Sequence, residues 1–103
     1  MDSFKLAMED AINQLDTVTD YLYKQKIKMA YTKLNGVVVV LAGLIDQLYE
    51  MNRNSQLKDF DINEIAGKLT EALNAMEAGD NVLLADILKY EIADQLRLIQ
   101  NSL

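Results

Sequence analysis

The first apolar stripe of the chain recurs in steps of three or four residues, which is the spacing of one face of an α-helix. Its members are Phe4, Met8, Ala11, Leu15, Val18 and Leu22. Ser3 is a residue type that can cap a helix start, so the pattern predicts a helix over about Ser3 to Tyr23. The stripe is lost at residues 24–26, where we predict a tight turn near Gln25.

A second stripe with the same spacing begins after this interruption. Its members are Ile27, Ala30, Leu34, Val37, Leu41, Leu44, Leu48 and Met51. The two stripes do not join into one face, which favours a turn between two helices. Because neither glycine nor proline stands at this point, a single bent helix is the alternative.

The second half of the chain predicts another pair of helices after a loop, "NRNSQLKDF", at residues 52–60. Asp61 and Glu64 have the spacing of a capping box, Gly79 can end the third helix in a left-handed conformation, and Asp80 can cap the fourth. The two apolar stripes are Ile62, Ile65, Ala66, Leu69, Leu73 and Met76, then Leu84, Ala85, Leu88, Ile92, Leu96 and Ile99. The pattern predicts an all-α antiparallel four-helix bundle made of two helical hairpins, a single domain over residues 1–103.

The stretch "GVVVVLAGLI", residues 36–45, is apolar on every side of the second predicted helix. Valine favours strands, yet the helical register passes through the stretch without slipping, so we interpret it as helix. At about 100° per residue, Val39 points away from the core stripe, with Gly36, Val40 and Gly43 on the same rear side. A helix that is apolar all round is normally covered all round.

Two arrangements would cover this rear side. In the first, Gly36, Val39, Val40 and Gly43 form a self-association surface, and a two-fold homodimer packs this helix against its copy. In the second, the nearby loop "NSQLKDF" folds over the patch within one chain. The fourth helix offers a rival interface, because Leu83, Ile87 and Leu98 widen its apolar arc.

Composition narrows the classes of function. The chain of 103 residues has a net charge of −6, which argues against a nucleic-acid partner. No membrane interaction is expected, because no window approaches the roughly 18 apolar residues of a membrane span. The N-terminus shows no secretory signal, so we expect a cytoplasmic protein. With no histidine and no cysteine, the usual general base, thiolate nucleophile and imidazole ligand are absent. We therefore expect no enzyme activity, no cofactor and no metal.

Two local patterns resemble functional sites without matching them. Asp59, Asp61 and Asn63 imitate a calcium loop, but Glu64 stands where the loop needs glycine. Lysines are interleaved with tyrosines over residues 21–33, which is compatible with single-stranded nucleic acid or, more in keeping with the net charge, an acidic protein partner. Lys24 also has the spacing of a helical ion pair with Asp20.

Glu91 lies at the edge of the fourth apolar stripe, where a carboxylate usually reaches solvent or pairs with a lysine across the bundle. An alternative function rests on this region. A small apolar ligand would occupy the bundle core, with Tyr90 or Glu91 orienting it.

Two segments, "KQKIKMAYTKLN" and "LNAMEAGDNVLLADILKYEI", resemble a family of small uncharacterised helical-bundle proteins of bacteria. The resemblance spans the second to fourth predicted helices and implies a bacterial cytoplasmic bundle of unknown function, with no catalytic residues to transfer. "GVVVVLAG" departs from it, since a more polar helix is expected there. Taken together, the sequence predicts a non-enzymatic protein-interaction bundle, adaptor-like or chaperone-like, that forms a homodimer through its second helix.

Overall fold

The computed structural model describes residues 2–54 and 59–103, and these residues form four helices and no strand. The first three helices are α1 (Asp2–Tyr23), α2 (Ile27–Arg53) and α3 (Ile62–Ala78). The fourth is continuous but has three segments: α4 (Asn81–Asp86), a π-helical segment η1 (Ile87–Ala93) and α5 (Asp94–Ser102). The predicted all-α class is confirmed.

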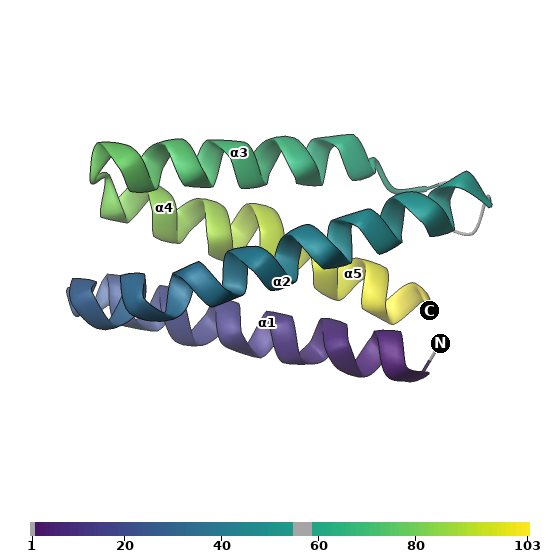
Figure 1. Ribbon diagram of the computed structural model, residues 1–103, viewed down its shortest axis with the longest axis horizontal. Coiled ribbons are helices and arrows are strands. Elements are labelled where there is room, and N and C mark those ends of the chain that lie inside the picture. The colour runs from purple at the N-terminus through teal and green to yellow at the C-terminus, as the bar shows by residue number, and fades with distance from the viewer. Residues whose placement is uncertain (1, 55–58) are drawn as a thin grey trace.

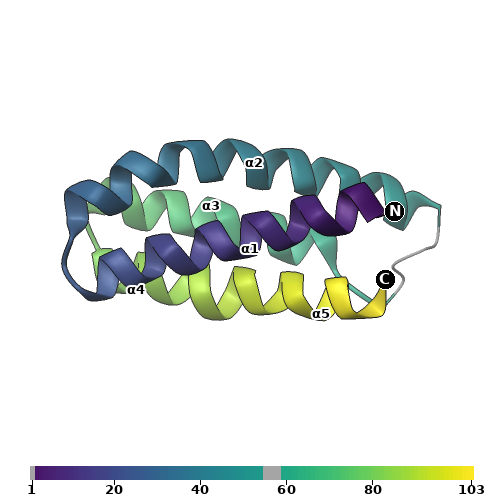
Figure 2. The same ribbon diagram turned by 90° about the horizontal axis from the view of Figure 1, so that it is seen from below.

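The helices lie side by side in an elongated body with extents of 40 × 23 × 19 Å (Figures 1 and 2). α1 packs against α2 and against all three segments of the fourth helix, while α3 packs mainly against α4 and η1. The two chain ends lie at the same end of the body (Figure 1). The side chain of Gln100 donates a hydrogen bond to the backbone oxygen of Lys5 at 3.3 Å, which joins the last helix to the first.

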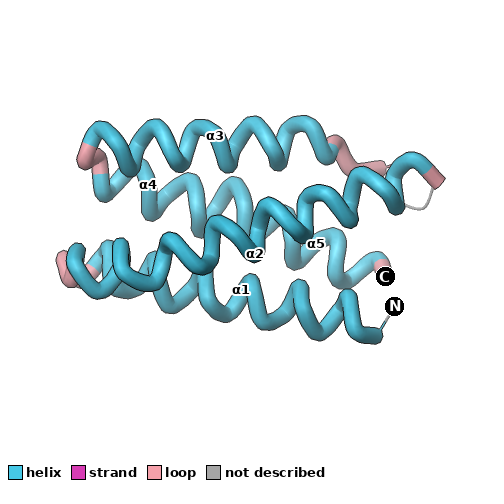
Figure 3. Tube along the Cα trace, viewed as in Figure 1, coloured by secondary structure: helices cyan, strands magenta, loops and turns pink. Residues whose placement is uncertain are grey.

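A tight turn separates α1 from α2 over residues 24–26 (Figure 3). Gln25 adopts a positive φ of 60°, and the backbone N–H of Lys26 donates to the oxygen of Tyr21 at 2.8 Å. A left-handed residue reverses the chain without glycine at a conformational cost of about 1–2 kcal/mol. The predicted turn near Gln25 is therefore correct, and the alternative of one bent helix is wrong.

The remaining helix ends follow the local sequence signals closely. Asp61 accepts a hydrogen bond from the N–H of Glu64, and Asp80 accepts one from the N–H of Leu83, each at 3.1 Å. Gly79 ends α3 with φ 69°, the left-handed conformation that glycine adopts without strain.

The expectation for Ser3 is wrong, because α1 begins at Asp2 and Ser3 lies inside it. α2 extends to Arg53, so the first two residues of the loop predicted at 52–60 are helical. Residues 55–58 of that loop lie outside the described part of the chain.

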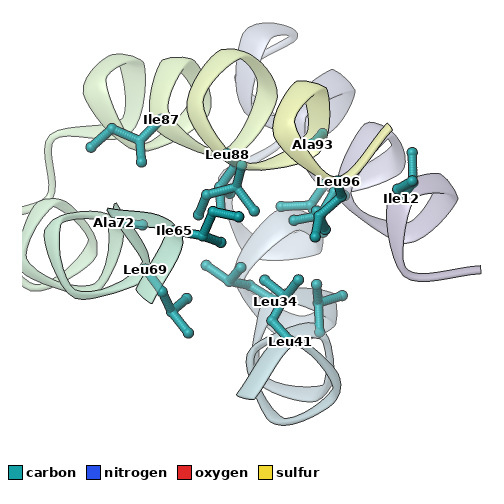
Figure 4. Packing of buried hydrophobic residues seen from close by; sticks show 14 of the residues in the cluster. Ile12, Leu34, Leu41, Ile65, Leu69, Ala72, Ile87, Leu88, Ala93 and Leu96 are labelled. Carbon is teal, nitrogen blue, oxygen red and sulfur yellow. The ribbon is translucent and has the colours of Figure 1, made fainter. Parts of the chain in front are cut away.

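The core runs the length of the body between the helices (Figure 4). Its members come from every helix, and the stripes predicted from the sequence supply most of them. The largest side chains that are almost fully buried are Met8, Leu15, Leu34, Leu41, Leu48, Ile62, Leu84, Leu88, Ile92, Leu96, Ile99 and Val18. Thr19 is the one buried polar residue in the described chain, and its hydroxyl donates to the oxygen of Asp16 at 3.0 Å.

The π-helical segment η1 was not predicted, and it corrects the register of the fourth helix. In a regular α-helix, the buried residues between Leu84 and Ile99 would spread over about 240°. A π-bulge absorbs one extra residue per turn, which brings the same residues within about 160°. One consequence concerns Ile87, predicted to widen an exposed arc: it is only 3% exposed and points from η1 toward α3 (Figure 4).

Candidate functional site

The outer face of α2 carries an apolar patch that no other described segment covers. We call Gly36, Val39, Val40 and Gly43 the α2 patch. Val39 is 72% exposed and Val40 is 37% exposed, although the neighbouring Val37 is fully buried. Met29 extends the apolar surface toward the start of the helix and is 50% exposed. Within the chain, then, the residues predicted for self-association lie together at the surface.

The two glycines make this patch flat. A Cβ built on either Gly36 or Gly43 would meet nothing within 4 Å, so packing inside the chain does not require glycine at these positions. Glycine in a helix interior costs roughly 0.5–1 kcal/mol relative to alanine. Open space therefore lies above both glycines on the outer face of α2.

The described part of the 54–60 segment does not cover the patch. Asp59 and Phe60 line a cavity of about 360 Å³ with Tyr49 and Asn52, close to the C-terminal end of α2. Residues 55–58 lie outside the described part of the chain. The high exposure of Val39 thus leaves the intramolecular arrangement without support from the described contacts.

Charges are distributed unevenly along the same exposed face. Lys28 and Lys33 lie in the N-terminal half of α2, whereas Asp46 and Glu50 lie in the C-terminal half. A surface groove of about 390 Å³ lies beside the lysines and is lined by Tyr21, Lys28, Met29, Thr32 and Lys33. The apolar α2 patch therefore lies between two lysines and two carboxylates, and the outer carboxylate, Glu50, pairs with Arg53 at 3.1 Å.

By length and composition alone, α2 is apolar enough to cross a membrane. The same test is passed by the core helix of a soluble protein, and seven residues of α2 are buried inside this body. They are Ala30, Leu34, Val37, Leu41, Leu44, Ile45 and Leu48. The inner face of α2 is thus already used for packing.

The rival surface on the fourth helix is smaller than predicted. Leu83 is 47% exposed and Leu98 is 55% exposed, but Ile87 between them belongs to the core. Fifteen residues separate the two leucines, roughly 22 Å along a helix. Leu83 and Ile87 line one surface groove of about 370 Å³ with Ala75 and Ala78, whereas Leu98 does not line it.

The residues predicted to orient a core ligand lie at the surface. Glu91 forms an ion pair with Lys68 of α3 at 3.2 Å, and Tyr90 is 56% exposed. Both line a polar cleft of about 310 Å³ between α3 and the fourth helix. Hydrogen bonds to Glu71 and Glu91 raise the pKa of the Lys68 ammonium. The predicted pairing of Glu91 with a lysine is confirmed.

Near the tight turn, Tyr23 joins α1 to the fourth helix through a contact that the sequence did not indicate. Its hydroxyl donates to Asp86 at 2.6 Å, and burial together with this bond raises the pKa of Tyr23. The Lys89 ammonium lies 5.5 Å from the centre of the same ring. Such a contact links residues 63 positions apart, so no local spacing reveals it.

Other residues with functional spacing have structural roles. Tyr31 donates to Asn81 at 2.7 Å, and Lys24 pairs with Asp20 at 3.0 Å, as its i,i+4 spacing predicted. In the calcium-like segment, Asp61 caps α3 and Asn63 accepts a hydrogen bond from Tyr49 at 2.7 Å. Across residues 2–54 and 59–103, no group of three potential metal ligands is present. The α2 patch is a predicted interface whose four residues all lie exposed on one helix.

Comparison with known proteins gives a family for the whole chain. No curated protein and no solved structure matched it. A match over residues 1–102 was found with the family described as Domain of unknown function (DUF8042), in agreement with the resemblance to small uncharacterised helical proteins. The chain belongs to this family of unknown function.

Proposed function

We propose that this protein is a non-enzymatic interaction module, adaptor-like or chaperone-like, that acts as a homodimer formed through the α2 patch. The single observation that carries the proposal is the exposure of Val39, in the middle of the longest helix, at 72%. In this proposal the fold is an antiparallel four-helix bundle made of two helical hairpins. The tight turns at residues 24–26 and 79–80 support that arrangement.

The energetic argument starts from the valines. Burying a valine side chain fully contributes roughly 1.5 kcal/mol or more relative to leaving it in water. Val39 and Val40 are adjacent, and Met29 lies on the same side of α2, so one contact removes all three from solvent. Contiguous apolar surface of this kind marks interaction sites in soluble proteins.

The shape of the patch favours another helix as the occupant. Gly36 and Gly43 lie seven residues apart, which is two turns of one face, and both have open space above their Cα atoms. A helix can therefore approach α2 closely without displacing side chains. A two-fold axis presents the same patch from both chains, so one flat surface supplies both halves of the contact.

The chemistry of the chain supports a binding role over catalysis. The sequence has no histidine and no cysteine, the residues most often used as general base and thiolate nucleophile. Of the four carboxylates that line the cleft between α3 and the fourth helix, Glu91 pairs with Lys68 at 3.2 Å. The residue types of the chain thus favour a surface for recognition over a site for catalysis.

Light scattering after size-exclusion chromatography tests the proposal with the unmodified chain and two variants. Val39→Asp places a carboxylate in the centre of the proposed contact and is expected to yield monomers. Val82→Asp is the matched control, because Val82 is also well exposed, at 67%, but lies on α4. It is expected to remain dimeric.

Circular dichroism and thermal unfolding of both variants show whether either change disturbs the fold. Both sites are exposed, so both variants are expected to remain folded. An unmodified chain that stays monomeric at about 100 µM, where even weak interfaces are substantially populated, overturns the homodimer. So does a dimer that Val39→Asp leaves intact.

A further inference from the structure

Two charged residues of α2 lie at the end that the electrostatics of the helix disfavour, whereas Arg53 in the last turn lies at the favoured end. A helix N-terminus carries a partial positive charge and its C-terminus a partial negative charge. Lys28 lies in the first turn of α2 and Glu50 in the last turn. Each charge therefore interacts unfavourably with the helix dipole, at a cost of about 0.3–1 kcal/mol. Within the described chain, Lys28 and Lys33 form no ion pair; Glu50 has only an exposed contact with Arg53, at 3.1 Å.

Four polar residues are also placed symmetrically about Val39. Thr32 and Asp46 each lie seven residues from Val39, and Lys28 and Glu50 each lie eleven residues from it. At about 100° per residue, all four fall within about 20° of the direction of Val39. A line along the exposed face therefore reads lysine, threonine, valine, aspartate, glutamate.

We infer that the occupant of this face is a second copy of the chain packed antiparallel, with Val39 on the two-fold axis. The inference rests on the proposed homodimer and specifies its geometry. In this arrangement Lys28 of each chain lies opposite Glu50 of the other, and Thr32 lies opposite Asp46. Each interface then contains two intermolecular Lys28–Glu50 pairs related by the two-fold axis.

The basic groove supports the antiparallel choice. It is lined by Lys28 and Lys33 with Met29 between them, and it lies toward the N-terminal end of α2. In the antiparallel pair, the segment facing this groove is the acidic end of the partner helix, Asp46 to Glu50. A parallel pair would instead place Lys28 against Lys28 and Glu50 against Glu50, which is repulsive at both ends.

Cross-linking through introduced cysteines tests the geometry directly, because the natural chain contains none. Thr32→Cys and Asp46→Cys are prepared as separate proteins, and both sites are exposed. Antiparallel packing places the thiol of the Thr32→Cys chain opposite the thiol of the Asp46→Cys chain, whereas the thiols of two Thr32→Cys chains are about 21 Å apart along the axis. Mild oxidation of the mixture is expected to yield a covalent dimer, and each variant alone is expected to yield little.

Charge reversal tests the pairing independently. Lys28→Glu and Glu50→Lys are each expected to weaken association about tenfold, since each replaces two attractions by two repulsions. The double variant Lys28→Glu/Glu50→Lys restores both attractions and is expected to regain most of the affinity. Glu9→Lys on α1 changes net charge as Glu50→Lys does and serves as the control, with affinity expected to remain within about twofold.

The outcomes separate this inference from the proposed function. An unmodified chain that is monomeric overturns both. A dimer in which Thr32→Cys alone cross-links as efficiently as the mixture is parallel; the homodimer then stands and the antiparallel geometry is wrong. Single charge reversals that leave the dissociation constant unchanged also overturn the Lys28–Glu50 pairing, whereas rescue by the double variant supports it.

Discussion

In the middle of α2, around the α2 patch, the inner and outer faces are built from similar residues and have opposite environments. Val37 and Leu41 on the inner face are at most 1% exposed, and they pack against the other helices. Val39, only two residues from each, is 72% exposed. Within residues 36–45, hydrophobicity therefore does not distinguish the two faces, whereas the register of the flanking apolar stripe does.

This difference separates residues that make the fold from residues available for a partner. The inner face contributes through close packing, where removing atoms leaves a cavity. On the outer face, the exposed atoms of a residue such as Val39 make no packing contacts within one chain. They contribute to a free energy only when a second molecule covers them. Substitutions on the two faces can be compared to measure how far folding and association depend on different residues.

Leu41→Ala on the inner face is expected to have the largest effect. Truncating a buried leucine costs about 3 kcal/mol of unfolding free energy, because the apolar contacts are lost and a cavity remains. Leu41 is 1% exposed and belongs to the core cluster (Figure 4). Urea unfolding followed by circular dichroism measures the loss. A cost below about 1 kcal/mol would contradict the assignment of this face to the core.

Tyr31→Phe tests the flank between the two faces. The Tyr31 hydroxyl donates to Asn81 at 2.7 Å and also lies 3.3 Å from the oxygen of Met76, so it joins α2 to the end of α3 and the start of α4. Removing a partly buried hydrogen bond is expected to cost about 1 kcal/mol. Urea unfolding measures it, and an unchanged midpoint would show that the bond contributes nothing net.

Gly43→Ala on the outer face is expected to have effects of opposite sign on folding and association. Alanine should stabilise the monomer by roughly 0.5–1 kcal/mol, because glycine is unfavourable within a helix and the new Cβ meets nothing within 4 Å. In the dimer the same Cβ would separate the two helices and weaken association.

Gly67→Ala is the matched control for that experiment. Gly67 is also exposed, lies within α3 and has no atom within 4 Å of a built Cβ. It should give the same stabilisation without changing the dissociation constant measured by sedimentation. Equal effects of both variants on association would remove the special role of the α2 patch.

Val39→Ala is expected to have the smallest effect on folding. Under dilute conditions, where the monomer dominates, the unfolding free energy should change by less than about 0.5 kcal/mol, as for other exposed sites. Urea unfolding at two protein concentrations checks this. A larger loss in the monomer would mean that a segment of the same chain covers Val39 in solution, and the contrast between the two faces would disappear.

Most of the fold could be predicted because its signals are local. The stripe from Phe4 to Leu22 and the caps at Asp61 and Asp80 depend on spacings of three or four residues, and the structure places them as expected. The π-helical segment could not be predicted, since it adjusts the fourth helix to neighbours supplied by α1 and α3. Ile87 was assigned to the surface for that reason, because its direction depends on the register that η1 introduces.

The candidate site was accessible to sequence reasoning only in part. Periodicity alone located Val39 opposite the core stripe, and its exposure agrees with that prediction. Periodicity does not predict which molecule covers the patch, because the free energy of covering an outer face depends on a second molecule. The bond from Tyr23 to Asp86 was missed for a related reason: it joins residues that become neighbours only when the helices pack.

The shared position of the two chain ends has a consequence for protein engineering. Because they lie at the same end of the body, a short glycine-serine linker can join them (Figure 2). The chain can then be opened at the exposed turn of residues 24–26, so that α2 comes first in the translated order and α1 last. Such a circular permutant keeps every helix intact and moves both free ends to the opposite end of the body, where attached labels or fused domains would emerge instead.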